Sequence, residues 1–474
     1  MLEFLSNLST NLLYLIFYSV ISACAFWACP RKWREICLLL FNIVFYTVCC
    51  KWYVLFILFA GVWSWYSAKR LDTADANRKG WLWAGIVPLV LILCTFKYWT
   101  PLTDFISGFV SNDSLIGFAR IALPLGMSYY ILKSISYLAD VYNGKIQSER
   151  NLISYLTYVS FFAQIIAGPI QRYSQWKEEI NRDAPVKNAK NGYYHIVSGL
   201  FMKVVIANRL GDYVMGIMND PVGANGVQLW IGFFLYAVYI YCDFAGYSHI
   251  AIGITNFFGL DCIDNFKMPY LSRNIKEFWN RWHISLSTWL RDYIYIPLGG
   301  NRKGEVRRIF NLMVTFLVSG MWHGSTWNFV VWGGYHGALN ALTPKKLVGL
   351  GSNRLKIIAL TVLNAFLVAV GWIFFATPTI SAAGEYFKGM VTRLSLDMSS
   401  IQMAILPITM DNTCIASFGT VMMFIVIGAV KEINDRYQIV KSKEWMSYCW
   451  QIFMLTSILL FGMFGKSSFI YAGF

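Results

Sequence analysis

The residues MWHGSTWN, at positions 321–328, place an imidazole between two indoles in an otherwise apolar stretch. Ionisable groups at membrane depth are costly, so they are functional candidates by default. A neutral imidazole suits the removal of a proton from a hydroxyl at physiological pH. His323 is therefore the first candidate for chemistry, and Trp322 and Trp327 are candidate walls of a narrow passage. The alternative is a structural histidine, hydrogen-bonded between packed helices.

The spacing of charges predicts where this imidazole lies. His323 follows Arg308 by fifteen residues, which is roughly 22 Å along a helix with a rise of about 1.5 Å per residue. The hydrocarbon core is about 30 Å thick, so His323 is expected near its middle or outer half. Gly320 and Gly324 allow a neighbouring helix to approach closely.

From their sequence context alone, the other histidines are expected to have interfacial or structural roles. His283 lies in KEFWNRWHISLSTWLRDYIYIPLGG, a stretch too charged to span and rich in aromatic residues, which is typical of an interfacial amphipathic helix ended by Pro297 and the glycines after it. His336 follows His323 by about 3.6 helical turns, so on an unbroken helix it faces elsewhere and is structural. His195 and His249 are expected to pack or to form hydrogen bonds.

Asp243 is a carboxylate within an apolar span, in YCDFAGYSH. It needs a partner there, and the Arg and His residues of 273–291 are the candidates. A structural ion pair is the expected role.

Several enzyme classes lack support in the sequence. The chain has no G-x-S-x-G, no Walker loop and no G-x-G-x-x-G after a strand. Ten cysteines lie mainly in apolar runs, with no C-x-x-C pair and no Cys/His cluster at metal-ligand spacing. Free thiols, no metal and no bound cofactor are therefore expected.

The composition predicts an all-α, multi-spanning integral membrane protein. Of 474 residues, 57% are hydrophobic and 14% are charged, whereas soluble chains carry about 25% charged residues. The first span, from Leu8 to Cys29, is long enough to cross the bilayer and is expected to remain in the mature protein. The net charge of +15 is dispersed over short loops, which indicates topology and contact with anionic lipids rather than nucleic acid.

Basic loops mark the cytoplasmic side. The first thirteen residues contain no Lys or Arg, and basic residues follow the first span, so the N-terminus is expected outside. The longest basic cytoplasmic segment is 265–308, and a long Lys-poor loop at 378–412 is expected outside. Eight full crossings plus hairpins put both termini outside. After the first span the apolar segments are a hairpin at 36–67, runs at 81–98 and 121–140, a hairpin or re-entrant element at 151–169, spans at 192–218 and 228–258, a hairpin at 309–342, and spans near 357–377, 414–431 and 447–466.

Five stretches resemble the membrane-bound O-acyltransferase family, and specifically its bacterial alginate O-acetylation branch. They cover most of 121–340 in the family's order, and a W-H-I-S and a W-H-G about forty residues apart in a polytopic protein is a specific signal. The sequence departs from the branch at His249, where its members often carry an acid. The stretches are PLGMSYYILKSISYLADVYNG (124–144), QIIAGPIQRY (164–173), DFAGYSHIAIG (243–253), NFKMPYLSRNIKEFWNRWHISLSTWLRDYIYIPLGGNR (265–302) and MWHGSTWNFVVWGGYHG (321–337).

The resemblance implies a fold, a donor and a site. The fold is a single membrane domain over 1–474 with about 11 membrane helices, re-entrant hairpins and interfacial helices around a central tunnel. Its parts are N-terminal helices (1–120), a catalytic core (121–345) and C-terminal helices (346–474). His323 corresponds to the family's catalytic histidine, and His283 to a second position where histidine or asparagine occurs. Tunnel or donor-binding residues would be Trp322, Trp327, Asn280, Asp243, Arg302 and Lys303, the last two at the phosphates of coenzyme A unless topology alone explains their charge.

The implied reaction moves an acetyl group from cytoplasmic acetyl-CoA across a bacterial inner membrane. The acceptor would be an extracytoplasmic polysaccharide, and a separate extracytoplasmic acetyltransferase the partner. Related teichoic acid D-alanyl transfer proteins share both histidines, so D-alanyl transfer from an acyl carrier protein is an alternative. A flippase without covalent chemistry is a second alternative; it predicts two similar halves, and the sequence has no such repeat.

Overall fold

The computed structural model is built of helices alone in the part of the chain that it describes. The described residues are 12–73, 77–107, 123–182, 185–343, 354–409, 418–437, 439 and 444–464. By their contacts they divide into two compact units, and two long helices, α11 (Pro185–Leu200) and α13 (Gly226–Phe257), run from one unit into the other. The predicted all-helical class is confirmed.

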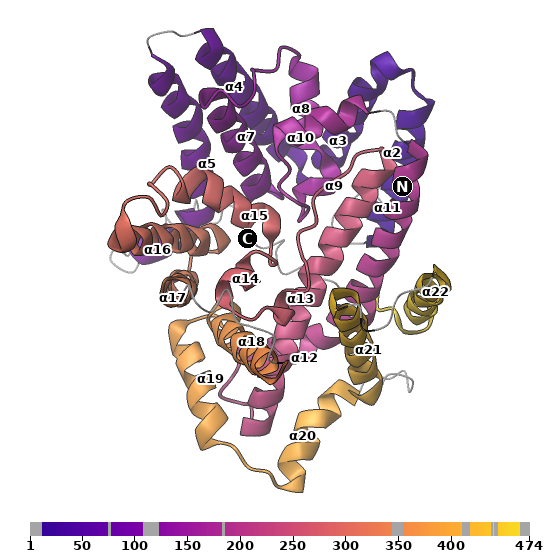
Figure 1. Ribbon diagram of the computed structural model, residues 1–474, viewed down its shortest axis with the longest axis vertical. Coiled ribbons are helices and arrows are strands. Elements are labelled where there is room, and N and C mark those ends of the chain that lie inside the picture. The colour runs from indigo at the N-terminus through magenta and orange to yellow at the C-terminus, as the bar shows by residue number, and fades with distance from the viewer. Residues whose placement is uncertain are drawn as a thin grey trace. The chain divides into compact units, whose positions relative to one another are not determined.

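The first unit holds the N-terminal helices and the end of α13, up to Ile263. Its core is formed where α4 packs against α5, α7 and α8, and α3 against α8 (Figure 1). The helices are α2 (Leu12–Ala28), α3 (Arg34–Cys50), α4 (Val54–Thr73), α5 (Arg78–Ser107), α7 (Met127–Tyr142), α8 (Leu152–Ser160), α9 (Phe162–Ile165) and α10 (Tyr173–Asn181).

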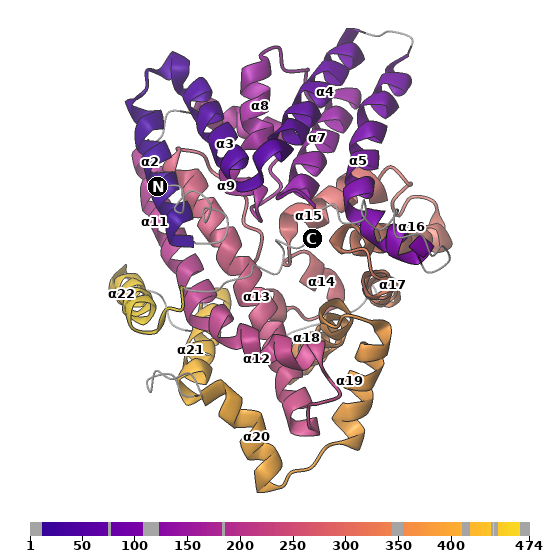
Figure 2. The same ribbon diagram turned by 180° about the vertical axis from the view of Figure 1, so that it is seen from behind.

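Two predicted hairpins lie in this unit. The apolar stretch 36–67 is broken by a 3-10 turn at Lys51–Tyr53, where Lys51 has a φ of 52°, and α3 and α4 form a V around it (Figure 2). The stretch 151–169 forms the short helices α8 and α9, and every residue from 157 to 171 is buried. Irregular backbone at membrane depth is tolerated where protein covers it. The burial of this segment is compatible with a re-entrant element, and its depth in the membrane stays a prediction.

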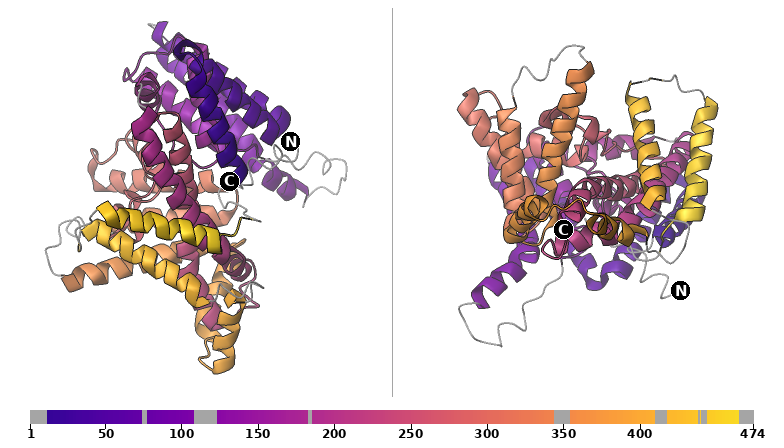
Figure 3. Two further views of the ribbon diagram at one scale, coloured as in Figure 1. Left: turned by 90° about the vertical axis from the view of Figure 1, so that its right-hand side faces the viewer. Right: turned by 90° about the horizontal axis from the view of Figure 1, so that it is seen from below.

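The second unit holds the histidines of the W-H-I-S and W-H-G motifs. Figure 3 shows α21 and α22 side by side at its C-terminal end, where Phe424 contacts Phe453 and Phe461. Its helices are a π-helix at Phe201–Ala207, α12 (Asn208–Asn219), α14 (Ile275–Trp279), α15 (Ile284–Leu290), a π-helix at Arg291–Tyr295, α16 (Gly304–His323), α17 (Trp327–Leu342), α18 (Arg354–Ala376), α19 (Ile380–Thr392), α20 (Met398–Thr409), α21 (Phe418–Tyr437) and α22 (Glu444–Phe461).

Two sequence predictions in this unit are wrong. The stretch around His283 is no continuous interfacial helix, because the chain breaks between α14 and α15 and the aromatic side chains of α14 point into the core. The segment 378–412 is not simply a loop, since α19 and α20 occupy most of it. The hairpin at 309–342 is confirmed as α16 and α17, which pack closely along their length.

Four stretches of the described chain are long and apolar enough to cross a membrane: Arg31–Thr73, Arg78–Phe105, Gly226–Phe257 and Arg354–Ala376. In the first, second and fourth of these stretches most residues are not buried inside the protein, whereas most of Gly226–Phe257 is buried. The predicted total of about 11 membrane helices and the outward position of both termini stay predictions.

Candidate active site

His323 is the last residue of α16, and the helix ends there because Gly324 adopts an extended conformation. Its side chain is buried among three aromatic rings: the centroids of Trp322, Trp332 and Phe375 lie 4.9, 5.1 and 5.4 Å from that of the imidazole. The ring is therefore fixed from α16, α17 and α18 together.

Glycine brings α17 close enough for these contacts. A Cβ atom on Gly320 would collide with the carbonyl oxygen of Phe329, and one on Gly333 would collide with the carbonyl oxygen of Phe316. Both helices thus approach each other backbone to backbone. The predicted role of Gly320 in close helix approach is confirmed.

His283 enters the same cluster from the loop between α14 and α15. Its imidazole lies 4.7 Å from the ring of Phe244, at an interplanar angle of 89°, and 6.3 Å from Trp322. Trp322 therefore contacts both predicted catalytic histidines. The structure brings together in the second unit two residues that are forty positions apart in the sequence.

The backbone at His283 is left-handed, with φ 43° and ψ 54°. A residue other than glycine in this region costs about 1–3 kcal/mol and needs surrounding structure to hold it, a combination that is frequent at functional sites. The segment around Asn265 supplies that structure: its carbonyl oxygen accepts from Ile284 N–H at 2.9 Å and its side-chain oxygen from Ser285 N–H at 3.2 Å. Lys267 N–H donates to the carbonyl of Arg281 on the other side of the turn.

His336 belongs to this cluster too, which sequence reasoning missed. The turn count assumed an unbroken helix, but the helix ends at His323 and α17 folds back along α16, so the count does not apply. The structural role expected for His336 stays a prediction. His336 lies 5.1 Å from Trp332 and 5.1 Å from Trp279, so Trp332 separates it from His323. The i, i+4 spacing of Trp332 and His336 was the available signal.

Asp243 forms the expected buried ion pair, but its partner was predicted wrongly. Its Oδ1 accepts from Nζ of Lys203, and both side chains are buried. Lys203 lies on the π-helix Phe201–Ala207, whose extra residue per turn changes which side chains face α13, an effect that an ordinary helical pattern does not reveal. Asp243 is linked to the histidines through its neighbour Phe244.

The remaining candidates lie outside the ring cluster. Trp327, at the start of α17, is 74% exposed, and Asn280, which caps α14, is exposed as well. Arg302 and Lys303 are exposed and precede α16, at the end opposite His323. Twenty helical residues separate them from it, which corresponds to about 30 Å. This separation favours a topological role for the two basic side chains.

The first unit contains a second buried polar centre, on α7. Lys133 is buried and donates from Nζ to the carbonyl of Tyr158 at 2.6 Å and to Oε1 of Gln164 at 3.2 Å. Nε2 of Gln164 donates to Oε1 of Gln171, and Nε2 of Gln171 donates to the carbonyl of Asp261. Sequence reasoning missed this network, although a lysine in the middle of the apolar run 121–140 was a visible signal.

His195 and His249 also lie in the first unit and confirm their predicted role. Their Nδ1 atoms are 2.8 Å apart and their rings stack at 27°. One Nδ1 must donate and the other accept, so the two rings hold complementary tautomers.

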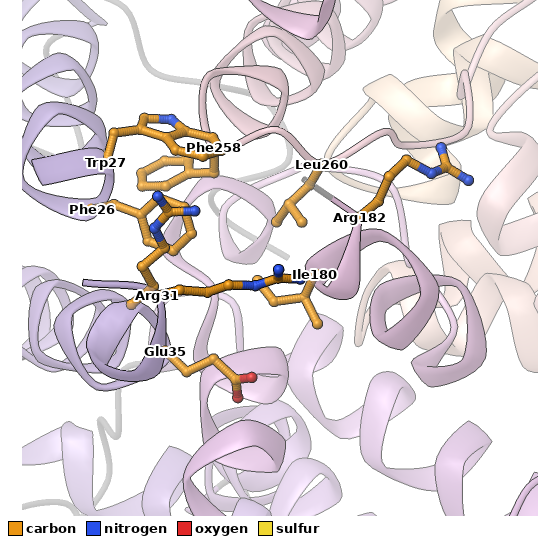
Figure 4. A pocket seen from close by; sticks show the side chains of 9 residues that line it. Phe26, Trp27, Arg31, Glu35, Ile180, Arg182, Phe258 and Leu260 are labelled. Carbon is orange, nitrogen blue, oxygen red and sulfur yellow. The ribbon is translucent and has the colours of Figure 1, made fainter. Parts of the chain in front are cut away.

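The first unit also carries a small mixed cavity of about 100 Å³. Phe26, Trp27 and Phe258 form its aromatic side, while Arg31 and Glu35 approach from the other side (Figure 4). The guanidinium of Arg34 lies over Trp27, 4.5 Å from the ring centroid. Neither histidine of the two motifs lines this cavity.

Several helices of the chain are long and apolar enough to span a membrane, which is typical of a multi-pass membrane protein. The two buried imidazoles beside Trp322 form a candidate site for proton transfer. Residues 12–349 match the sequence profile of the membrane-bound O-acyltransferase family. The chain belongs to this family, and it is an acyl-transferring enzyme.

Three relatives illustrate the range of the family. A probable alginate O-acetylase of Pseudomonas syringae pv. tomato is 34% identical over 407 residues, which cover 83% of this chain and 77% of the relative. The peptidoglycan O-acetyltransferase of Helicobacter pylori is 32% identical and covers 76% of this chain and 74% of the relative. The teichoic acid D-alanyltransferase of Streptococcus thermophilus is 31% identical, with 60% and 69% covered.

Proposed function

We propose that this protein transfers an acetyl group from cytoplasmic acetyl-CoA for the O-acetylation of an extracytoplasmic polysaccharide, across the inner membrane of a bacterium. His323 is the general base, and His283 is the second catalytic histidine. The observation that carries the proposal is the pair of buried imidazoles that both contact Trp322, in a chain whose relatives include O-acetylases of two cell-envelope polymers.

The chemistry asks little of the protein beyond alignment and a base. An acyl thioester is already activated, so the hydroxyl oxygen attacks its carbonyl carbon while the imidazole takes the hydroxyl proton. The carbon–sulfur bond then breaks, and the thiolate leaves with the proton that the imidazolium returns. A neutral imidazole suits the first step, and general-base assistance of this kind accelerates a reaction by about 10²–10⁴.

The acceptor side completes the proposal. A donor in the cytoplasm and an acceptor outside meet only through a passage across the bilayer, and a separate extracytoplasmic acetyltransferase would receive the acetyl group. The ring cluster of Trp322, Trp332 and Phe375 would form the walls of the passage near His323. These aromatic side chains exclude water, which would otherwise hydrolyse the thioester.

D-alanyl transfer from a carrier protein is the second candidate, because teichoic acid D-alanyltransferases are among the relatives. The alginate O-acetylase alignments cover more of this chain, 83% against 60%. Acetyl transfer is therefore preferred.

The test uses the purified full chain in liposomes, with acetyl-CoA labelled in the acetyl group. We expect His323→Ala to reduce acetyl-dependent release of free CoA by about 10²–10⁴ with an unchanged melting temperature. Lys388→Gln, on the exposed face of α19, is the control and keeps the wild-type rate. Equal CoA release from wild type and His323→Ala contradicts the assignment of the base. Turnover with a D-alanyl carrier protein but not with acetyl-CoA selects the second candidate.

A further inference from the structure

A second cavity, of about 200 Å³, lies on the second unit between the C-terminal end of α17 and the first half of α18. A cavity of about 150 Å³ lined by apolar side chains accepts a benzene molecule. This cavity is therefore large enough to accommodate a segment of an alkyl chain. Most of its lining is aliphatic, and its residues are Arg273, Asn274, Ile275, Leu339, Leu342, Thr343, Leu360, Leu363, Asn364 and Leu367.

The cavity opens on an exposed apolar surface. Leu342 is 77% and Leu363 is 53% exposed although both line the cavity. The same helix, α18, is one of those apolar enough to cross a membrane. It exposes Leu355, Ile358 and Val362 as well. An acyl chain of the bilayer can therefore enter the cavity sideways without passing through water.

The rim of the cavity is basic. Arg273 donates from its backbone N–H and its Nε to Glu277, and within the described residues its two terminal guanidinium nitrogens make no hydrogen bond. Lys276 reaches the same rim, where its Nζ donates to the carbonyl of Thr343 at 3.3 Å. Guanidinium groups bind phosphate oxygens in a bidentate geometry.

Among the described residues, the carboxylate beside this rim does not neutralise it. Glu277 is contacted by Arg273, Arg281 and Arg436 at 3.3, 3.1 and 2.7 Å. One negative charge is thus shared among three positive ones, which leaves an excess of positive charge beside the mouth of an apolar cavity. That combination is complementary to a molecule with one anionic head and a hydrocarbon tail.

We infer that this cavity is a binding site for an anionic glycerophospholipid of the leaflet on the basic side of the protein. One acyl chain lies between Leu339, Leu363 and Leu367, and the phosphodiester accepts hydrogen bonds from the terminal nitrogens of Arg273. The site is independent of the acyl-transfer proposal, because its residues are separate from the histidine cluster.

The experiment uses the full chain in nanodiscs that contain phosphatidylglycerol with a photoreactive diazirine in one acyl chain. After irradiation, labelled peptides are mapped by mass spectrometry. We expect labelling of 339–343 and 360–367. Arg273→Gln should reduce it about fivefold, since one basic side chain near a membrane surface contributes about 1 kcal/mol to the binding of anionic lipid. Lys267→Gln removes an exposed charge from the same segment but not from the cavity, and should leave labelling of these peptides unchanged.

A second pair of variants tests the apolar part. Leu363→Trp fills the cavity and should abolish labelling of 339–343, whereas Leu355→Trp, on the exposed face of the same helix, should not. Unlabelled phosphatidylglycerol should displace the probe, and inorganic phosphate at equal ionic strength should not. Labelling that is indifferent to both Arg273→Gln and Leu363→Trp, or displacement by inorganic phosphate, would overturn the inference.

Discussion

The two units each bury a polar centre, and the centres are built in opposite ways. In the first unit, Lys133 is held by directed hydrogen bonds to Tyr158 and Gln164 and lies over the ring of Tyr158, with Nζ 4.3 Å from its centroid. In the second unit, His323 is held by the faces and edges of Trp322, Trp332 and Phe375. Directed hydrogen bonds thus hold Lys133, whereas aromatic rings surround His323.

The different contacts of Lys133 and His323 indicate different roles, structural for Lys133 and chemical for His323. A buried ammonium is tolerable only if its protons are used, because an unpaired buried charge is very costly. A histidine can instead be buried in its neutral form, and aromatic rings can pack against it and fix its position. The Lys133 centre should therefore matter mainly for stability and the histidine centre mainly for turnover.

Lys133→Met is the variant with the largest expected effect on stability. It leaves the carbonyl of Tyr158 and the Oε1 of Gln164 buried without their donor, which should reduce the free energy of unfolding by about 1.5–3 kcal/mol. Thermal unfolding in detergent measures it, with the exposed Lys79→Met as control. Acetyl transfer per folded molecule should stay within about twofold, since residues that share no partners are independent of one another to within about 0.3–0.5 kcal/mol. A large loss of turnover at an unchanged melting temperature would place Lys133 in the chemistry and remove the contrast.

His283 sharpens the comparison because its backbone and its side chain can be tested separately. His283→Val places a β-branched residue at φ 43° and should lower stability by about 1–3 kcal/mol relative to His283→Gly. His283→Asn should fold almost as well as wild type, because Asn tolerates the left-handed region. Melting temperatures of the three variants give the backbone effect, and acetyl transfer by His283→Asn gives the side-chain effect. Equal stability of the valine and glycine variants would contradict the strained turn.

Much of the fold was readable from the sequence because hydropathy and basic loops report directly on burial in a membrane. The apolar run 228–258 and the hairpin 309–342 became α13 and the α16–α17 pair with small shifts. Features that depend on a single backbone conformation were missed. The left-handed turn at His283 divides a stretch whose pattern is continuous, and only its tertiary contacts with Asn265 reveal the break.

The site was partly predictable for the same reason. His283 and His323 were named from their motifs, and the structure places both against Trp322. Lys203 could not be identified as the partner of Asp243, because the π-helix that presents it has no signature in hydropathy. His336 was excluded by counting turns along a helix that ends at Gly324.

His336 tests whether ring packing alone marks a chemical role. Neither of its ring nitrogens has a hydrogen-bond partner among the described residues, and it is fully buried. Replacing a polar group that has no partner by an apolar one of similar size is nearly neutral. His336→Met should therefore change stability by less than about 1.5 kcal/mol and leave acetyl transfer intact. A turnover loss comparable to that of His323→Ala would extend the catalytic set to this third histidine.

Glu149 provides the smallest expected effect, at the polar edge of the first centre, in the loop between α7 and α8. Burial opposes ionisation of its carboxyl, but hydrogen bonds from Tyr173, Lys177 and the N–H of Asn151, together with the charge of Lys177, outweigh burial and lower its pKa. A carboxylate with a lowered pKa stabilises the folded state above the pKa of the unfolded chain, and this contribution disappears as the pH falls through the folded-state pKa.

Glu149→Gln should consequently lower stability at pH 7 by about 1 kcal/mol or less, as expected for an ion pair near the surface. The difference from wild type should shrink as the pH falls below about 4.5, the ordinary pKa of a glutamate side chain. The pH dependence of this stability difference is measured from the melting temperatures of both proteins, at steps of about one pH unit between about pH 3.5 and about pH 8. His323 lies among the aromatic rings of Trp322, Trp332 and Phe375, so His323→Ala should show no such convergence at low pH. If the stability of His323→Ala also approached that of wild type at low pH, the Lys133 centre and the histidine centre would be energetically coupled. The proposed difference between the two centres would then be contradicted.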